Sequence, residues 1–202
     1  MKQQFLTTEQ TDANIASFQK AMDLLTPQLH EQVTEKLLDG VTGQEYFEAP
    51  ASAKADYHSC FPGGLLHHSL KVTRNLHKII PELVVANQTK SWITFAGMFH
   101  DIGKCGDGEN SYYVEQDSDW HREKLGQYYT YNEEVKYMVV AQRSLYLIQR
   151  AGIVLPFDVY QAILLHDGYI LEGNRSYCLK EKPLASALQS ADYLATIDEK
   201  QK

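Results

Sequence analysis

The apolar positions along the chain follow a helical period almost throughout. Apolar residues recur at helical spacing from Ile15 to Leu25, which predicts a helix over about residues 8–25. Proline and glycine punctuate the later periodic stretches, which predict helices over about 26–38, 65–79, 90–101, 133–150, 157–166 and 183–199. Gly40 and Pro81 are expected to end the second and third of these helices. Alternation typical of strands is nearly absent, so we expect an all-α helical bundle, a single domain of 202 residues.

Residues 103–131 interrupt the helical pattern. Glycine, aspartate and tyrosine cluster there, which predicts a long loop with a short helix, and such a loop inside a compact domain is often functional. Its aromatic residues either stack on a nucleobase or pack the loop onto the domain, and packing is the more common arrangement. They are Tyr112, Tyr113, Trp120, Tyr128, Tyr129 and Tyr131. Acidic residues in the same stretch would repel a polyanion, which favours a small phosphorylated substrate over extended nucleic acid.

Composition and charge narrow the classes of partner. The formal net charge is -7, which argues against a broad nucleic-acid-binding surface but leaves room for a local basic groove. The N-terminal residues lack the apolar core of a signal peptide, and no apolar stretch approaches the ~20 residues that span a bilayer. Cys60, Cys105 and Cys178 are scattered without a CxxC pair, so we expect reduced thiols. A cytoplasmic protein with no membrane partner is therefore expected.

Four metal-binding side chains occupy positions where the neighbouring residues are apolar. His68 shares a helix face with apolar residues, His100 and Asp101 close an apolar helix, and Asp192 lies on the inward stripe of the last helix. Each alone has an ordinary explanation as a hydrogen-bonded core histidine or a buried ion pair. Together they offer two imidazoles and two carboxylates, a set that suits Mn, Fe, Zn or Mg and leaves positions for water and substrate.

The order of these residues resembles the HD superfamily of metal-dependent phosphohydrolases. The chain has Gly63-Gly64-Leu65-Leu66-His67-His68-Ser69, then His100-Asp101-Ile102-Gly103-Lys104, and a late helical Asp192. The resemblance covers about residues 58–195, so residues 1–57 are expected to form N-terminal helices packed on this core. It implies a helical bundle with a divalent metal at its centre, held by His68, His100, Asp101 and Asp192. In this pattern the histidine before Ser or Thr is the ligand, which selects His68 over His67.

A second metal is a separate question. Some members of the superfamily use extra histidines between the doublet and the last aspartate, and His121 and His166 are the candidates here. Residues 139–144 offer no further ligand, which argues against a complete second site. His121 is alternatively a solvated loop residue or a substrate contact, and His166 is alternatively the end of a helix that Gly168 stops.

Candidate substrate contacts surround this set of ligands. Lys104 follows the doublet closely and either places an ammonium group against a phosphate or is a solvated loop lysine. Arg143 lies in a largely apolar helix and either clamps a phosphate or pairs with a carboxylate. His58 precedes the first ligand helix and is a candidate for the same cleft, and Asn174 is a candidate for its mouth.

The expected function is therefore metal-dependent hydrolysis of a phosphate mono- or diester, with a nucleotide or another small phosphorylated metabolite as substrate. Asp101 is expected to bind metal and orient the attacking water, and Lys104 to neutralise charge that develops on the phosphate. Two alternatives remain open. One is a degenerate domain that binds a nucleotide and regulates without turnover, and the other is a nuclease acting on single strands.

Overall fold

The computed structural model describes residues 3, 5–80 and 89–200. These residues form a helical bundle with one small two-stranded hairpin, so the predicted all-α, single-domain fold is confirmed. The helices are α1 (Thr8–Met22), α2 (Pro27–Glu31), η1 (Gln32–Thr42), α3 (Glu45–Glu48), α4 (Gly64–Ile79), α5 (Lys90–Phe99), η3 (Ile102–Lys104), α6 (Asp119–Leu125), α7 (Val140–Arg150), α8 (Phe157–Leu165), η4 (Gly168–Ile170), η5 (Glu172–Tyr177) and α9 (Pro183–Lys200). The strands are β1 (Tyr113–Glu115) and β2 (Tyr129–Tyr131).

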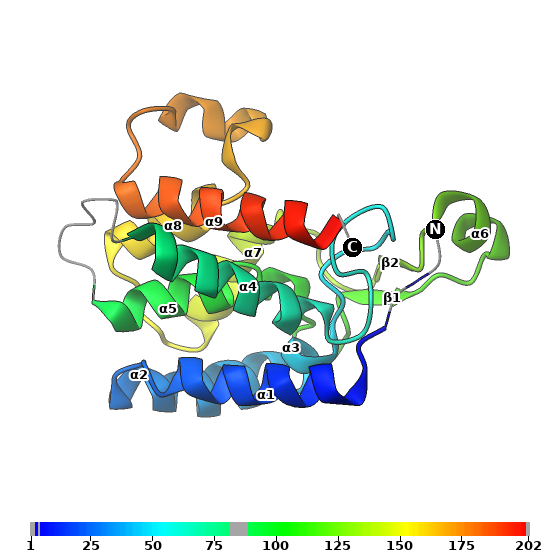
Figure 1. Ribbon diagram of the computed structural model, residues 1–202, viewed down its shortest axis with the longest axis horizontal. Helices are drawn as coiled ribbons and strands as arrows, with labels where there is room; N and C mark the ends of the chain where they lie inside the picture. Colours follow the sequence, from blue (N-terminus) through cyan, green and yellow to red (C-terminus); the bar gives the residue numbers. More distant parts are fainter. Residues whose placement is uncertain (1–2, 4, 81–88, 201–202) are drawn as a thin grey trace.

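Helix α4 is the centre of the bundle. It packs against α5 and α9 and also contacts α1 and α3, while α8 packs against both α5 and α9. Figure 1 shows α1 and α2 along one side of this central group, with α9 along the other. The α4 side chains Leu65, Val72 and Leu76 are completely buried in the core. The apolar faces of four helices therefore meet around α4, and any polar side chain on its inner face must find a partner there.

A glycine sets how closely α5 approaches α4. A Cβ atom at Gly97 would lie 2.7 Å from Thr73 Oγ1 and 2.8 Å from Thr73 Cα, closer than van der Waals contact allows. His100 follows Gly97 by three residues and ends α5, so this contact also sets how far the His100 ring lies from α4.

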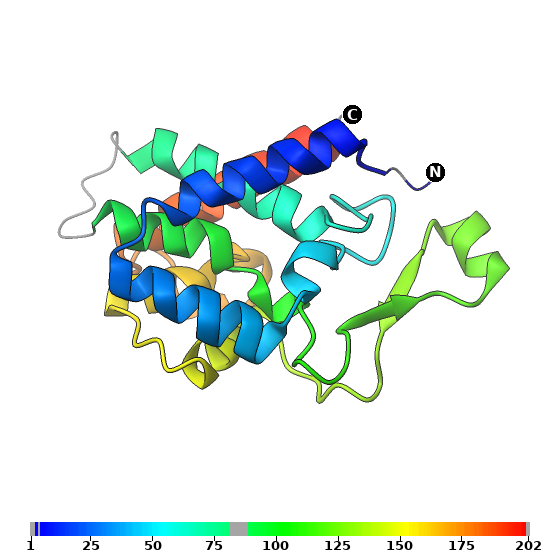
Figure 2. The ribbon, with the colours of Figure 1, turned by 90° about the horizontal axis from the view of Figure 1, so that it is seen from below.

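The hairpin corrects the expectation of a strandless loop over residues 103–131. Strands β1 and β2 pair antiparallel, with Val114 opposite Thr130, and α6 lies between them as the predicted short helix. Figure 2 shows the hairpin and α6 extending away from the helices. Each strand has only three residues. Such short strands cannot display the alternation by which strands are recognised in a sequence.

Two predicted helix limits are wrong. The second helix does not end at Gly40, because α2 continues into the π-helix η1 and ends only before Gly43, whose φ of 56° closes the turn. The helix predicted from residue 133 begins at Val140. The Asn132 side chain accepts a hydrogen bond from the Glu134 backbone N–H at 3.1 Å, a local turn that competes with helix formation. The predicted stop at Pro81 lies outside the described residues.

Long apolar helices are absent from the described part of the chain. No helix there is both long and apolar enough to cross a membrane.

Candidate metal centre

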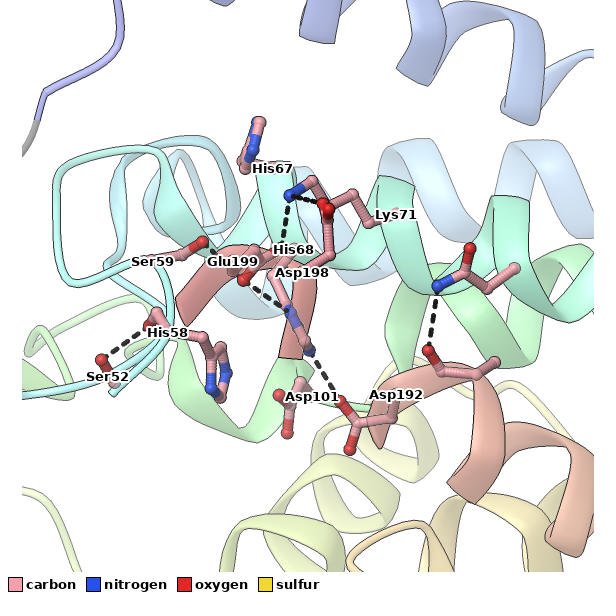
Figure 3. A network of polar contacts seen from close by, with 12 residues as sticks. Ser52, His58, Ser59, His67, His68, Lys71, Asp101, Asp192, Asp198 and Glu199 are labelled. Atoms are coloured by element: carbon pink, nitrogen blue, oxygen red, sulfur yellow. Dashed lines mark hydrogen bonds and ion pairs between the residues drawn. The ribbon is translucent and has the colours of Figure 1, made fainter. Parts of the chain in front are cut away.

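Three central helices bring the predicted metal-binding residues together. His68 lies on α4, His100 and Asp101 follow α5, and Asp192 lies on α9. His68 Nε2 is 2.9 Å from Asp192 Oδ1, and His100 Nε2 is 3.6 Å from Asp101 Oδ2. The two imidazoles are completely buried, and the Asp192 side chain is 19% exposed. Figure 3 shows the His68 ring directed at Asp192, with Asp101 on the same side of α4.

Two further histidines join this group. His166 Nε2 lies 3.3 Å from Asp101 Oδ1, and the His166 ring centroid is 4.9 Å from that of His100. His58 reaches the group from the loop before α4, and its ring lies against that of His68 with centroids 4.3 Å apart. The structure therefore brings together six donor residues, four of which the sequence predicted as metal ligands.

His68, His100 and His166 each use the Nδ1 atom for a protein contact. The acceptors are Glu199 Oε2 for His68 at 3.2 Å, Gly97 O for His100 at 3.0 Å and Ile163 O for His166 at 2.7 Å. A ring that donates Nδ1–H to an oxygen carries its lone pair on Nε2. When the rings are neutral, as metal binding requires, all three lone pairs therefore lie on the side of the ring that faces the centre, which is the usual arrangement of metal-binding histidines.

A divalent metal fits this arrangement. The Nε2 atoms of His100 and His58 are buried and have no hydrogen-bond partner, although an unsatisfied buried polar group costs about 1–3 kcal/mol, and His68 Nε2 faces only the Asp192 carboxylate, without a hydrogen bond of good geometry. The donor atoms fall into overlapping groups of three, each within 4.8 Å, a spread that an ion about 2 Å from each donor can span after small shifts. Imidazoles mixed with carboxylates suit Mn, Fe and Zn, so the residues present can hold a divalent ion.

Neighbouring carboxylates change the ionisation of the histidines. Burial favours the neutral form of His68, but its contacts with Asp192 and Glu199 raise its pKa to about 9. Burial also favours the neutral form of His166, but nearby carboxylates raise its pKa to about 10. Burial dominates at His100, whose pKa falls to about 4. At neutral pH without metal, protons therefore occupy His68 and His166, and metal binding must displace them.

Lys104 is placed against the Asp101 carboxylate. Its Nζ atom donates to Asp101 Oδ2 at 2.6 Å, and its side chain is 13% exposed. Burial would raise the pKa of Asp101, but Lys104 and the nearby histidines hold that pKa well below its ordinary value. Burial would likewise lower the pKa of Lys104, but Asp101 raises it. The centre therefore contains a permanent ammonium group beside a permanent carboxylate.

The other predicted contacts lie elsewhere. Arg143 donates to Cys105 O at 3.0 Å, with its guanidinium carbon 5.2 Å from the centroid of the Tyr112 ring, so it holds the segment after the doublet against α7. The Asn174 side chain donates to Gly168 O at 3.0 Å within its own loop. His121 lies on α6, where its Nδ1 atom is 2.8 Å from Ser118 Oγ. Among the described residues, none of the three belongs to a donor group of the centre.

Two residues of the site were not singled out from the sequence. Glu199 contacts His68, and the available signal was its position seven residues after Asp192, which places both on one face of α9. Tyr113 lies within electrostatic range of Lys104 and Asp101, and burial raises the pKa of its phenol. Nothing in the sequence separated Tyr113 from its aromatic neighbours.

The fold and the site together define a helical protein with a buried cluster of histidines and aspartates that can hold a metal ion. A family model described as HD domain matches residues 65–197, more than half of the chain, and the chain therefore belongs to the HD domain family. Proteins of this family bind divalent metals, and the family lies within a superfamily of metal-dependent phosphohydrolases. Comparisons with curated proteins and with solved structures give no match. The matched range includes the four predicted ligands, whereas His58 and Glu199 lie outside it.

Proposed function

We propose that the protein is a metal-dependent phosphohydrolase that cleaves a phosphate mono- or diester of a nucleotide or another small phosphorylated metabolite. The observation that carries the proposal is the convergence of His68, His100, Asp101 and Asp192, in which the buried His68 Nε2 and His100 Nε2 atoms face carboxylates and make no hydrogen bond of good geometry. Membership of the HD domain family supports the same chemistry.

The residues of the centre have separable roles in this reaction. A divalent ion bound to these ligands would lower the pKa of a water molecule and polarise a phosphoryl oxygen. Asp101 directs Oδ1 towards His166 and Oδ2 towards Lys104, so its carboxylate can accept a hydrogen bond from the attacking water and orient it. The Lys104 ammonium group lies at the same carboxylate and can neutralise charge that develops on the phosphate.

Tyrosines beside the centre support a substrate with an aromatic ring. Tyr113 lies near Lys104, and its ring stacks on that of Tyr131 with centroids 5.6 Å apart and planes at 27°. Stacked aromatic side chains accept a nucleobase on a free face. A phosphate at Lys104 and a base at Tyr113 would place a nucleotide across the junction of the hairpin and the helices.

A panel of phosphoesters tests the proposal. The Mn²⁺-loaded protein is incubated with nucleoside monophosphates, cyclic nucleotides and p-nitrophenyl phosphate, and product is measured by liquid chromatography. We expect turnover of at least one class by the parent protein and its loss in Asp101→Asn, which removes a charge and preserves shape. Asp39→Asn, an exposed carboxylate on η1, is the control and should retain activity. Binding of a nucleotide without turnover by the parent would replace hydrolysis with the regulatory alternative.

A further inference from the structure

Glu199 is a buried carboxylate in the last turn of α9. Its side chain is only 4% exposed, although the adjacent Asp198 side chain is 54% exposed. The Glu199 Oε2 atom lies 3.2 Å from His68 Nδ1 and accepts a hydrogen bond from Ser59 Oγ at 2.8 Å. Figure 3 shows Glu199 on one side of the His68 ring and Asp192 on the other. One carboxylate therefore contacts a metal-binding histidine and the loop before α4.

His68 needs a hydrogen-bond partner from another element, unlike His100 and His166. His100 and His166 both follow the last residue of a helix, and each ring contacts the carbonyl oxygen three residues earlier. Carbonyl groups at a helix end are free to accept such hydrogen bonds. His68 lies inside α4, where the backbone carbonyls of the preceding turn are already used by the helix. The Glu199 carboxylate supplies the acceptor that the His68 backbone cannot.

The identity of that acceptor determines which ring nitrogen of His68 carries a proton and which one faces the centre. An ionised carboxylate only accepts hydrogen bonds, so the His68 Nδ1 atom must carry a proton. In the neutral ring that binds metal, the lone pair then belongs to Nε2, which faces Asp192 at 2.9 Å. Without this contact the ring could rotate, or could carry its neutral proton on Nε2, and either change removes a donor from the metal centre.

The same carboxylate also holds the loop that carries His58. Ser59 adopts a φ of 46°, a left-handed conformation that is unfavourable for a residue other than glycine. The backbone is held there by its side-chain bond to Glu199 and by the Ser52 hydroxyl, which donates to His58 O at 2.7 Å. Glu199 thus connects the end of α9 to Ser59. The residue before Ser59 is His58, whose ring packs on that of His68.

We propose that Glu199 is a positioning residue of the metal centre, which fixes the His68 ring with Nε2 directed at the ion and anchors the His58 loop to the same carboxylate. The inference rests on metal binding by this centre and does not depend on which phosphoester is hydrolysed.

Metal affinity is the first test. Zn²⁺ binding to the whole protein is measured by competition with a chromophoric chelator for the parent, Glu199→Ala, Glu199→Gln and Asp198→Asn. We expect Glu199→Ala to bind Zn²⁺ about 10–100-fold more weakly, as is typical when the partner of a metal-binding histidine is removed. Glu199→Gln should be intermediate, because its amide oxygen can still accept from Nδ1–H. Asp198→Asn, which removes the neighbouring exposed carboxylate, should match the parent.

A proton resonance tests the contact itself. In Zn²⁺-loaded protein labelled with ¹⁵N-histidine, the His68 Nδ1–H signal of the parent should be shifted downfield and exchange slowly with solvent. Both features should weaken in Glu199→Gln and disappear in Glu199→Ala.

Unchanged Zn²⁺ affinity in Glu199→Ala, or an equal loss in Asp198→Asn, would overturn the proposal. If Glu199→Ala does not fold, Glu199→Met decides, since a parent-like Nδ1–H signal and affinity in a variant with no oxygen to accept that proton contradict the assigned role. Reduced Zn²⁺ affinity with no phosphoester turnover would retain this inference and reject only the hydrolase.

Discussion

His68 Nε2 and Asp192 Oδ1 face each other at 2.9 Å across the interface of α4 and α9, although that nitrogen has no hydrogen bond of good geometry. The two residues are far apart in the sequence and meet only because the two helices pack along their apolar faces. An imidazole and a carboxylate at this separation can share a proton or a metal ion. Whether the pair holds a proton or a metal ion should affect both the stability of the protein and its activity.

The stability of the metal-free protein should depend on pH on both sides of neutrality. His68 and His166 have pKa values raised to about 9 and about 10, so their contribution is complete below the unfolded value of about 6.5 and is lost as pH rises through 9 to 10. Burial lowers the pKa of His100 to about 4 and that of His58 to about 3, so stability also falls as pH decreases from about 6.5.

Thermal unfolding followed by circular dichroism in EDTA should therefore show a maximum melting temperature at pH 6 to 7. With Zn²⁺ present the alkaline decrease should disappear, because metal binding requires the deprotonated histidines. A melting temperature that is constant from pH 6.5 to 9 in EDTA would contradict these protonation states.

Gly97→Ala should separate α4 from α5. The added methyl would overlap Thr73, so we expect a loss of about 1–3 kcal/mol in the free energy of unfolding from overpacking. Urea denaturation measures it, and Gly173→Ala is the matched control because a Cβ atom at Gly173 would have no heavy atom within 4 Å. Because His100 ends the same helix, Zn²⁺ affinity should fall with stability in Gly97→Ala. Equal stability of the two variants would refute the close contact.

Lys104→Met should separate metal binding from turnover. The ammonium group at 2.6 Å competes with the metal for Asp101 Oδ2, so its removal should leave metal affinity equal or stronger. Loss of one charged donor to the transition state should lower kcat about 10²–10³-fold. Lys104→Arg, which keeps the charge, should retain part of the rate. A normal kcat in Lys104→Met, with metal content confirmed by elemental analysis, would exclude Lys104 from the reaction.

Tyr113→Ala should distinguish a nucleotide from a simpler phosphoester. If its ring stacks on a base, the loss of about 1–3 kcal/mol per stacked base should raise KM for a nucleotide about 5–150-fold. The KM for p-nitrophenyl phosphate should change less, since the smaller ring lacks a nucleobase. Tyr137→Ala, at a side chain 83% exposed, is the control. An equal KM change for both substrates would argue that Tyr113 only supports the hairpin.

The bundle was predictable because its helices carry clear apolar periodicity and clear ends. Proline begins α9 and glycine begins α4, and both signals stand in the sequence. The hairpin was not predictable, since Tyr113 and Tyr131 lie in strands of three residues whose pairing depends on contacts distant in the chain. The π-helical continuation past Gly40 was also hidden, because glycine permits a helix end without requiring one.

The site was predictable where an ionisable residue interrupts an apolar helix. His68 and Asp192 stand out for that reason, because a buried charge needs a partner. Glu199 does not stand out, because acidic residues in a final helical turn are usually solvated, and only the packing of α9 on α4 buries it. His58 lies in an irregular loop, where no periodicity indicates which way a side chain points. Such residues emerge only when the whole fold is known.

Metal content tests the central claim most directly. The parent, His100→Ala and His67→Ala are equilibrated with Mn²⁺ or Zn²⁺, passed through a desalting column and measured by elemental analysis. His67 is the matched control, because it neighbours His68 but points away from the centre in Figure 3. We expect about one ion per chain in the parent and in His67→Ala, and close to none in His100→Ala. A parent protein that retains no ion under these conditions would contradict the metal centre and the hydrolase built on it.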